Sequence, residues 1–203
     1  LPKLESDGNV EFTSTYSKEE FCKMVEKTKE YIFDGDIFQC VVSRRFEADY
    51  KNSLINAYRV LRSTNPSPYM VYMSIDGDEI ISTSPETLVK LQNGVLNTFP
   101  IAGSRPRGKT DTEDNALADE LIHDEKELAE HNMLVDLGRN DIGKISEFNS
   151  VKVTKYQEVL RYSKIMHICS EVEGKLKDGL DAFDAIESLL PAGTLSGAPK
   201  IRA

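Results

Sequence analysis

The chain has no apolar run approaching the roughly 20 residues of a membrane-spanning helix, and no charged-then-apolar segment at its start. These absences argue against a membrane protein and a secretory signal, so we expect a cytoplasmic protein with no membrane partner. Basic residues are also too few, with 25 lysines and arginines against 34 acidic residues and a net charge of −9. Because a nucleic-acid-binding protein needs a basic face, nucleic acid is excluded as an expected partner.

Cysteine is scarce, with only Cys22, Cys40 and Cys169 in 203 residues. The sequence contains no CxxC pair and no cysteine–histidine spacing typical of a zinc site. Each cysteine lies in an apolar-periodic segment, which favours reduced, buried thiols. The overall composition, with 39% hydrophobic and 29% charged residues, is that of a globular domain. Disorder is therefore excluded as a description of the whole chain.

Residues 103–110 (GSRPRGKT) match the phosphate-loop pattern G-x-x-x-x-G-K-[ST] letter for letter. A nucleotide-binding loop needs converging backbone N–H groups and a parallel strand–helix unit. Pro106 removes one N–H group, while Arg105 and Arg107 place bulky side chains where the backbone donors would converge. We therefore interpret the segment as an anion site and not as a nucleotide site, because it still combines cations with glycines.

Hydrophobic periodicity and turn signals predict an α+β protein with mostly antiparallel strands. A capping box at residues 17–20 begins the first predicted helix, and the turns Asp76-Gly77 and Asn93-Gly94 predict hairpins. The first predicted helix begins at the capping box and ends at Asp34-Gly35-Asp36. Further helices are predicted over 54–61, 110–135 and 180–189. The predicted strands are 37–46, 70–75, 79–82, 87–91, 95–102, 151–156 and 165–172.

Two glutamates on the predicted helix 110–135 are metal-ligand candidates. Glu127 and Glu130 lie three residues apart, so they project from one face of the helix about one turn from each other. Two such carboxylates suit a hard cation such as Mg²⁺, which often bridges to an anionic substrate. Spacing alone favours a solvated acidic face instead, because acidic residues crowd this helix. They are Asp119, Glu120, Asp124, Glu125 and Glu127.

Three other positions carry groups suited to catalysis or binding. Glu86 follows Pro85 at a break in the predicted meander, where a side chain can enter a cleft. His167 lies in an apolar strand, where a core role is common, yet histidine is the side chain best suited to proton transfer near neutral pH. Residues 191–200 form a loop of small residues with two hydroxyls and a lysine, which indicates either a linker or close backbone approach to a ligand.

Six blocks of the sequence, in this order, resemble the chorismate-utilising enzymes, most closely the large subunits of anthranilate synthases. The blocks are residues 38–46, 65–70, 84–86, 100–108, 130–137 with 139–141, and 191–200. The resemblance implies an α+β fold in which a sandwich of two antiparallel sheets is covered by helices. It also implies a chorismate-binding domain over 16–203, truncated at its C-terminus, and a linker or the end of a preceding segment over 1–15.

The resemblance assigns roles to these candidates. Glu130 matches the Mg²⁺ ligand of the family and Glu127 reaches the metal through water, with the metal holding a chorismate carboxylate; this reverses the interpretation from spacing. Glu86 matches the general acid that protonates the departing C4 hydroxyl group. His167 matches the histidine implicated in eliminating pyruvate, and Thr194 matches a catalytic threonine that contacts substrate.

Other matches distinguish the reactions within the family. Gly103 and Ser104 match chorismate contacts, although members usually carry threonine at the second position. Gln39, assigned to the substrate site, replaces the lysine that activates water in isochorismate and salicylate synthases, which disfavours hydroxide addition. Ala102 replaces the nucleophilic lysine of aminodeoxychorismate synthases. What remains is ammonia addition and pyruvate loss, which forms anthranilate in the first committed step of tryptophan biosynthesis. Within the block 100–108, both arginines are then expected to be scaffolding.

The resemblance also implies partners and a limit on this chain. A glutamine amidotransferase subunit would supply ammonia, and Pro68, Tyr69 and Met70 match part of a tryptophan feedback site. Further tryptophan, substrate and metal ligands of the family lie in segments outside these 203 residues, so we expect the chain alone to be inactive. Two alternatives stay open: an aminodeoxychorismate synthase component, which Ala102 disfavours, and a non-catalytic interaction or regulatory fragment.

Overall fold

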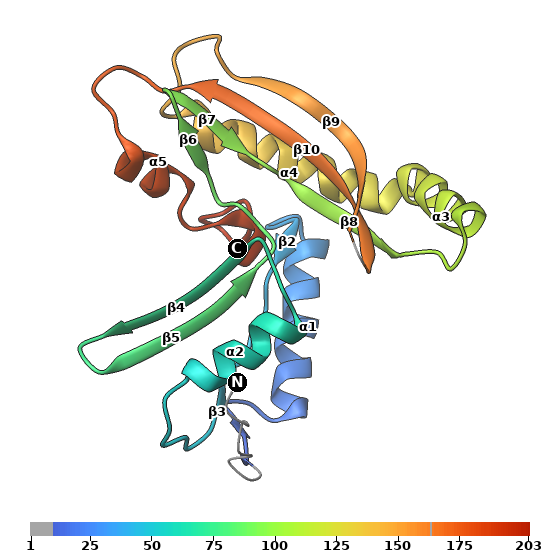
Figure 1. The fold of residues 1–203 in the computed structure, drawn as a ribbon. Coiled ribbons are helices and arrows are strands. Elements are labelled where there is room, and N and C mark those ends of the chain that lie inside the picture. Colours follow the sequence, from blue (N-terminus) through green and yellow to red (C-terminus); the bar gives the residue numbers. More distant parts are fainter. Residues whose placement is uncertain (1–9, 163) are drawn as a thin grey trace. The chain divides into compact units, whose positions relative to one another are not determined.

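The computed structural model describes residues 10–162 and 164–203, which form two compact units that divide the sequence between Glu86 and Thr87 (Figure 1). Both units combine helices with antiparallel strands, so the predicted α+β class is confirmed. The boundary expected at residue 16 stays a prediction, and the first nine residues of the segment 1–15 lie outside the described residues. No helix in the described part of the chain is long and apolar enough to cross a membrane.

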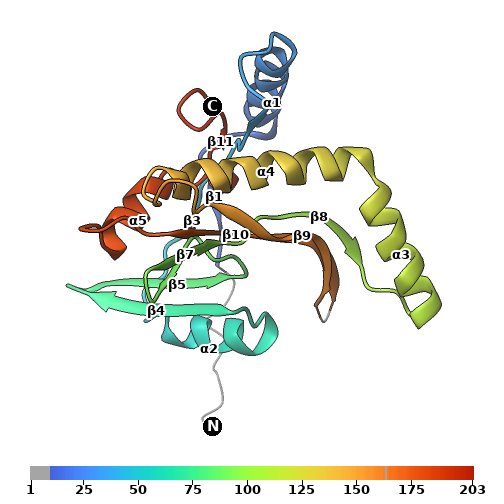
Figure 2. The ribbon, with the colours of Figure 1, turned by 90° about the horizontal axis from the view of Figure 1, so that it is seen from above.

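The first unit consists of two helices, a hairpin and short strands. The capping box forms as predicted, because Ser17 Oγ accepts the N–H of Glu20 and the Glu20 carboxylate accepts the N–H of Ser17. The second helix lies along the hairpin (Figure 2), and the Glu79 carboxylate attaches it by accepting the N–H of Leu54 and the Tyr72 hydroxyl. The elements are β1 (Thr13–Ser14), α1 (Lys18–Phe33), β2 (Gln39–Cys40), β3 (Phe46–Glu47), α2 (Ile55–Thr64), β4 (Tyr69–Ile75) and β5 (Asp78–Ser84).

The predicted buried strand over 37–46 is wrong. Within this range only β2 and the first residue of β3 are strand, and Ile37, 6% exposed, is its one buried residue. Phe38 is 74% exposed and Phe46 is 53% exposed. Branched and aromatic residues favour a strand only where neighbours supply ladder partners, and β1 pairs with β3 alone, through Thr13–Ser14.

The second unit is a five-stranded antiparallel sheet with α4 across one face (Figure 2). The central strand is β10, which pairs with β8 and β7 along one edge and with β9 along the other. The elements within the described residues are β6 (Lys90–Gln92), β7 (Val95–Thr98), β8 (Ile101–Pro106), α3 (Asp111–His123), α4 (Glu125–Gly143), β9 (Lys152–Arg161), β10 (Ile165–Lys175), α5 (Ala182–Leu189), a 3₁₀ turn (Gly193–Leu195) and β11 (Gly197–Ala198).

The core of the second unit lies between the sheet and its helices. Met166 and Ile168 of β10 are fully buried against α3, and Val172 is fully buried against α4 and α5. Because side chains alternate along a strand, these even-numbered residues face the helices and His167 points to the opposite face. This alternation decides on which side of the sheet each candidate residue lies.

The predicted single helix over 110–135 is wrong, because it is interrupted at Asp124. The side chain of Asp124 accepts the N–H groups of Lys126 and Glu127 at 3.0 and 3.2 Å and caps α4, while its backbone is extended. A short acidic side chain competes in this way with the helical hydrogen bond. Thr110 caps α3 as predicted, by accepting the N–H of Glu113.

The predicted strand over 95–102 is divided into β7 and β8 at Phe99-Pro100, where proline has no N–H for a ladder. The strand predicted over 87–91 is the shorter β6, whereas β9 and β10 are longer than the predicted strands 151–156 and 165–172. The cysteines are free thiols, but only Cys169 is buried; Cys22 is exposed and Cys40 is half-buried, which corrects the expectation for these two.

Candidate active site

A β-bulge in β8 brings several predicted site residues together. His167 opposes Ser104 and Ile168 opposes Ala102, so Gly103 is an extra residue between them. Gly103 has φ +76°, the left-handed conformation of a glycine bulge. Its carbonyl oxygen lies 3.2 Å from Nδ1 of His167. A carbonyl only accepts, so Nδ1 carries the hydrogen and Nε2 is left for proton exchange.

Glu127 of α4 lies against the same glycine. A Cβ atom on Gly103 would lie 3.2 Å from Glu127 Oε2 and 3.1 Å from Ile168 Cδ1. Ile168 faces the helices, whereas His167 points to the other face of the sheet. The bulge backbone is therefore flanked by Glu127 on the helical side and by His167 on the opposite side.

Glu130 lies one turn further along α4. Its side chain is half-buried and makes no hydrogen bond or ion pair with any other described residue. The Glu127 carboxylate contacts Arg105 Nη1 at 3.6 Å, longer than a hydrogen bond. No group of three or more histidine, cysteine, aspartate or glutamate side chains gathers as a metal site in the described part of the chain. The two carboxylates nevertheless fit Mg²⁺, which commonly takes one or two carboxylates and completes its octahedron with water and substrate oxygens.

Arg105 connects β8 to the break between α3 and α4. Its guanidinium contacts Glu120 Oε1 at 2.9 Å and Asp124 Oδ2 at 2.8 Å, in addition to Glu127. The N–H of Glu127, and then Arg105, hold the pKa of the Asp124 carboxyl below its usual value. Asp124 and Glu127 therefore belong to an ion-pair network with Arg105, whereas Glu120, with its side chain 61% exposed, fits the solvated acidic face that spacing alone favours.

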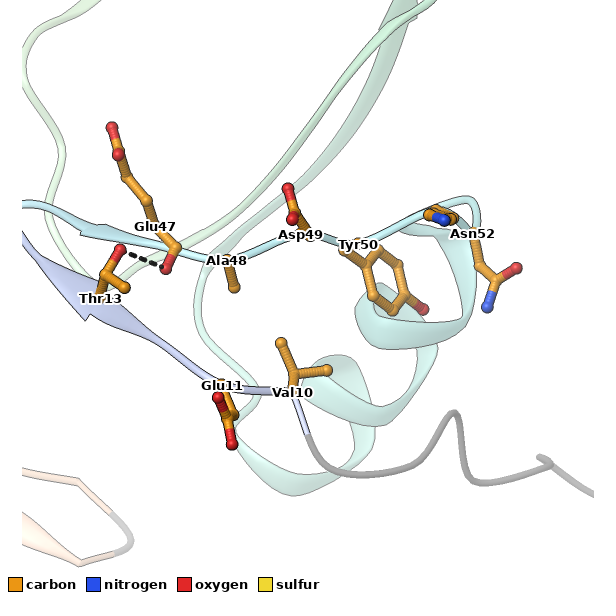
Figure 3. Close-up of a pocket in the computed structure, with 9 residues that line it drawn as sticks. Val10, Glu11, Thr13, Glu47, Ala48, Asp49, Tyr50 and Asn52 are labelled. Carbon is orange, nitrogen blue, oxygen red and sulfur yellow. Dashed lines mark hydrogen bonds between the residues drawn. The ribbon is translucent and has the colours of Figure 1, made fainter.

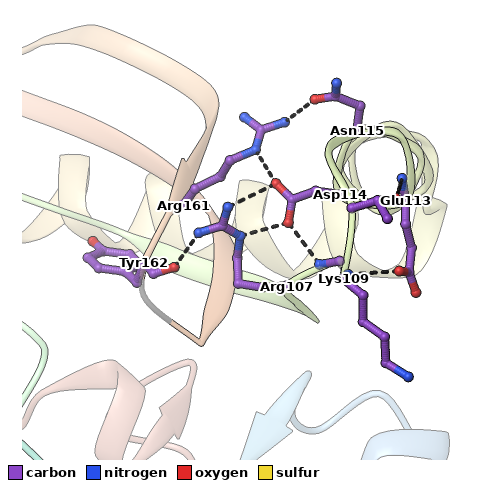
Figure 4. Close-up of polar contacts among 9 residues, drawn as sticks. Arg107, Lys109, Glu113, Asp114, Asn115, Arg161 and Tyr162 are labelled. Carbon is purple, nitrogen blue, oxygen red and sulfur yellow. Dashed lines mark hydrogen bonds and ion pairs between the residues drawn. The ribbon is translucent and has the colours of Figure 1, made fainter.

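Asp114 on α3 holds the segment 103–110 to the sheet (Figure 4). Its Oδ1 accepts from Arg107 Nε at 2.7 Å and from the Gly108 N–H at 2.8 Å, and its Oδ2 accepts from Arg161 Nε at 2.9 Å. Arg107 also donates to the Tyr162 carbonyl at 2.6 Å. The expected scaffolding role of both arginines is thus confirmed. The anion-site interpretation is wrong for these two arginines, because their guanidinium groups already form ion pairs with carboxylates of the protein.

We expect Asp114→Asn to lower the melting temperature by several degrees at pH 7 and to weaken its dependence on acid. The hydrogen bonds from Arg107 and Gly108 hold the pKa of Asp114 far below its ordinary value. The stabilisation is therefore complete above the unfolded pKa of about 4 and is lost as pH falls toward the folded pKa. Melting curves between pH 2 and pH 7 measure this. Asp119→Asn, at a carboxylate 75% exposed, is the control, and equal losses in both variants would contradict the assignment.

The loop 191–200 is docked on α4, so its interpretation as a linker is wrong. Lys200 Nζ forms an ion pair with Asp141 of α4, with the two side chains 10% and 9% exposed, and donates to the Leu189 carbonyl at 2.7 Å. Gly193 packs against α4 so closely that a Cβ would lie 3.0 Å from Leu137 Cδ1. Thr194 therefore lies in a 3₁₀ turn whose position is fixed by packing against α4. The sequence analysis did not predict this ion pair, although Asp141 lies in the block 139–141 and Lys200 in the block 191–200.

The other predicted site residues belong to the first unit, and their placement is described within that unit. Gln39 is half-buried in β2. Glu86 follows β5, half-buried, with its N–H donating to Ser84 Oγ at 3.3 Å. Pro68 directly precedes β4, and Tyr69 and Met70 are its first two residues; all three remain candidates for the feedback site.

A cavity of about 850 Å³ in the first unit contains none of the predicted site residues (Figure 3). Its side is formed where β1 meets β3, with the Thr13 hydroxyl donating to the Glu47 carbonyl at 3.4 Å. The lining residues are Val10, Glu11, Thr13, Glu47, Ala48, Asp49, Tyr50, Lys51 and Asn52. The candidate chemistry is therefore separate from this cavity.

Comparison with known proteins identifies the family. The pattern of the chorismate binding enzymes matches residues 2–203. The chain belongs to the chorismate binding enzyme family. It is 54% identical over 191 residues to anthranilate synthase component 1 of Acetivibrio thermocellus, covering 94% of this chain and 39% of that protein. It is 52% identical over 190 residues to component 1 of Aquifex aeolicus, covering 94% and 38%.

Solved structures agree with this membership. Anthranilate synthase component I from Streptococcus pneumoniae TIGR4 matches with a TM-score of 0.85 and 49% identity, over 95% of this chain and 42% of that one. A putative 2,3-dihydroxybenzoate-specific isochorismate synthase from Bacillus anthracis matches with a TM-score of 0.76 and 26% identity, over 99% and 56%. The resemblance to anthranilate synthase large subunits and the expected anthranilate-synthase-like fold are confirmed. The chain spans about two fifths of the length of the curated relatives named here.

Proposed function

We propose that the full-length protein carrying this chain uses Mg²⁺ and ammonia to convert chorismate to anthranilate and pyruvate. One observation carries the proposal: the Gly103 bulge lies against Glu127 and holds Nδ1 of His167, with the unpaired carboxylate of Glu130 one turn along α4. A pair of carboxylates for a cation and a histidine with a fixed tautomer meet the needs of an anionic substrate that must lose and gain protons. The roughly 50% identity to anthranilate synthase component 1 supports the choice of reaction.

The proposed roles follow the chemistry of each group. Glu130 would hold Mg²⁺ and Glu127 would reach it through water, and the ion would orient and neutralise a chorismate carboxylate. Gly103 and Ser104 contact the substrate from the bulge, and Thr194 contacts it from its turn. We assign Glu86 to protonate the C4 hydroxyl group as it leaves, and Gln39 to the substrate site.

His167 acts after ammonia has added at C2. Loss of the enolpyruvyl group as pyruvate makes the ring aromatic, so the proton on C2 must be removed. Nε2 of His167 is suited to this task because the Gly103 carbonyl holds the hydrogen on Nδ1. The same hydrogen bond fixes the orientation of the ring.

Two residues support ammonia over the other nucleophiles of the family. Gln39 carries a neutral amide, which cannot act as a base toward water. Ala102 is 8% exposed and opposes the fully buried Ile168, so the place of a nucleophilic lysine is here a core methyl group. A glutamine amidotransferase subunit is the proposed source of ammonia, and tryptophan, at the start of β4, is the proposed feedback inhibitor.

Identification of the product tests the proposed reaction. The full-length protein is incubated with chorismate, ammonium and Mg²⁺, and the products are separated by liquid chromatography. We expect anthranilate and pyruvate in equal amounts, and none without Mg²⁺. Aminodeoxychorismate or isochorismate as the product would replace the proposed reaction with another of the family. The 203 residues alone serve as a second sample, in which we expect no turnover.

A further inference from the structure

The residue that follows Glu130 is hydrogen-bonded inside the protein. His131 is fully buried, and its Nε2 lies 2.6 Å from Ser170 Oγ of β10. The same hydroxyl accepts the N–H of Gln157 of β9 at 3.0 Å. Its own hydrogen is therefore available to His131 Nε2, and one hydroxyl links α4, β9 and β10.

Asn132, the residue after His131, is hydrogen-bonded to two residues of β9. Its Oδ1 accepts the Tyr156 hydroxyl at 2.7 Å and Gln157 Nε2 at 3.0 Å. Gln157 has φ +55°, a strained conformation for a residue with a side chain, and lies where the pairing of β9 with β10 shifts register. The shift directs both the N–H and the side chain of Gln157 toward α4, as bulges beside functional sites often do.

The helix geometry connects these bonds to Glu130. At 3.6 residues per turn, Glu130 and Asn132 project about 200° apart, with His131 between them facing the sheet. The Asn132 side is bound to β9, on one edge of β10, whereas Glu127 lies against Gly103 of β8, on the other edge. Hydrogen bonds on the β9 side therefore resist rotation of α4 about its axis, and such a rotation would move Glu130 and Glu127 together.

We propose that His131, Asn132, Gln157 and Ser170 are positioning residues that fix the rotation of α4, so that Glu127 and Glu130 present their carboxylates to one divalent cation. This inference rests on the metal site of the proposed function. It extends to this chain the general behaviour of residues behind metal ligands, whose loss typically weakens metal affinity by about 10- to 100-fold.

Calorimetric titration of the full-length protein with MgCl₂ alone tests the inference. Asn132→Ala removes both bonds from β9 and is expected to raise the Kd for Mg²⁺ about 10-fold. Tyr156→Phe removes one bond and is expected to raise it about five-fold, the effect of one ordinary hydrogen bond. Because Tyr156 is 54% exposed, its variant folds and decides the question even if Asn132→Ala does not. Lys155→Met, on the same strand as Tyr156, removes an ion pair with Glu171 of β10 that does not involve α4, and its Kd should stay within two-fold of wild type.

The outcomes separate the inference from the function on which it rests. Loss of Mg²⁺ binding in Glu130→Ala, with Tyr156→Phe and Asn132→Ala within two-fold of wild type, overturns the positioning role and leaves the metal site in place. A wild-type Kd in Glu130→Ala overturns the metal site and the inference together. An equal rise in Lys155→Met and Tyr156→Phe also overturns the inference, because the effect would then not depend on contact with α4.

Discussion

A single methyl group on Gly103 is expected to lower chorismate turnover by the full-length protein at least about 100-fold, the cost of a small displacement in an aligned active site. The added Cβ would lie 3.1 Å from Ile168 Cδ1 and 3.2 Å from Glu127 Oε2, closer than ordinary van der Waals contact. The backbone φ of +76° is also unfavourable for alanine. Relief of both strains moves the carbonyl that holds His167 and the carboxylate proposed to reach the metal.

Gly94→Ala is a matched control for this prediction. Gly94 has the same φ of +76°, but a Cβ there would meet no atom within 4 Å. Its variant carries the backbone strain, of order 1 kcal/mol, without the contacts. We expect Gly94→Ala to lose stability and retain turnover, as measured by thermal melts and initial rates. Equal losses of turnover in the two variants would show that strain alone, and not the contact with Glu127, explains the effect.

The local features of the fold were predictable because their signals are contained in a few residues. Ser17 and Glu20 form the capping box that the sequence indicates, and the two Asx-Gly turns have the positive φ values of hairpin turns. The strand over 37–46 was not predictable in the same way, because pairing requires partners distant in sequence. The helix break at Asp124 had a local signal, a capping residue followed by glutamate three positions later, but the continuous acidic pattern obscured it.

The candidate site was predictable only in part for a similar reason. The three-residue spacing of Glu127 and Glu130 places them on one helix face, but it does not distinguish a metal site from a solvated face. The decisive contacts are tertiary: Arg105 reaches Glu120, and Gly103 lies against Glu127. The bulge depends on the register of β8 with β10, which no local pattern of residues determines. Resemblance to the family supplied the roles, and the structure shows which of these residues lie together.

Glu130→Gln is the second substitution with a large expected effect. The change keeps the size of the side chain but removes the charge that would bind Mg²⁺, so turnover should fall about 100- to 1,000-fold, as when a key electrostatic group of an active site is lost. Because Glu130 makes no hydrogen bond or ion pair with another described residue, the fold should keep its melting temperature. Glu125→Gln, at an exposed position on the same helix, is the control and should retain wild-type turnover.

Chorismate binding with and without Mg²⁺ is the sharpest test of whether Glu130 holds a metal ion for the substrate. Isothermal calorimetry is performed on the full-length wild-type protein and on Glu130→Gln, with chorismate in the syringe. We expect wild-type protein to bind chorismate at least about 10-fold more tightly with Mg²⁺ present, and Glu130→Gln to lose this difference. Chorismate binding that is independent of Mg²⁺, or that depends on Mg²⁺ equally in both proteins, would contradict it. The absence of chorismate binding would indicate a non-catalytic interaction module.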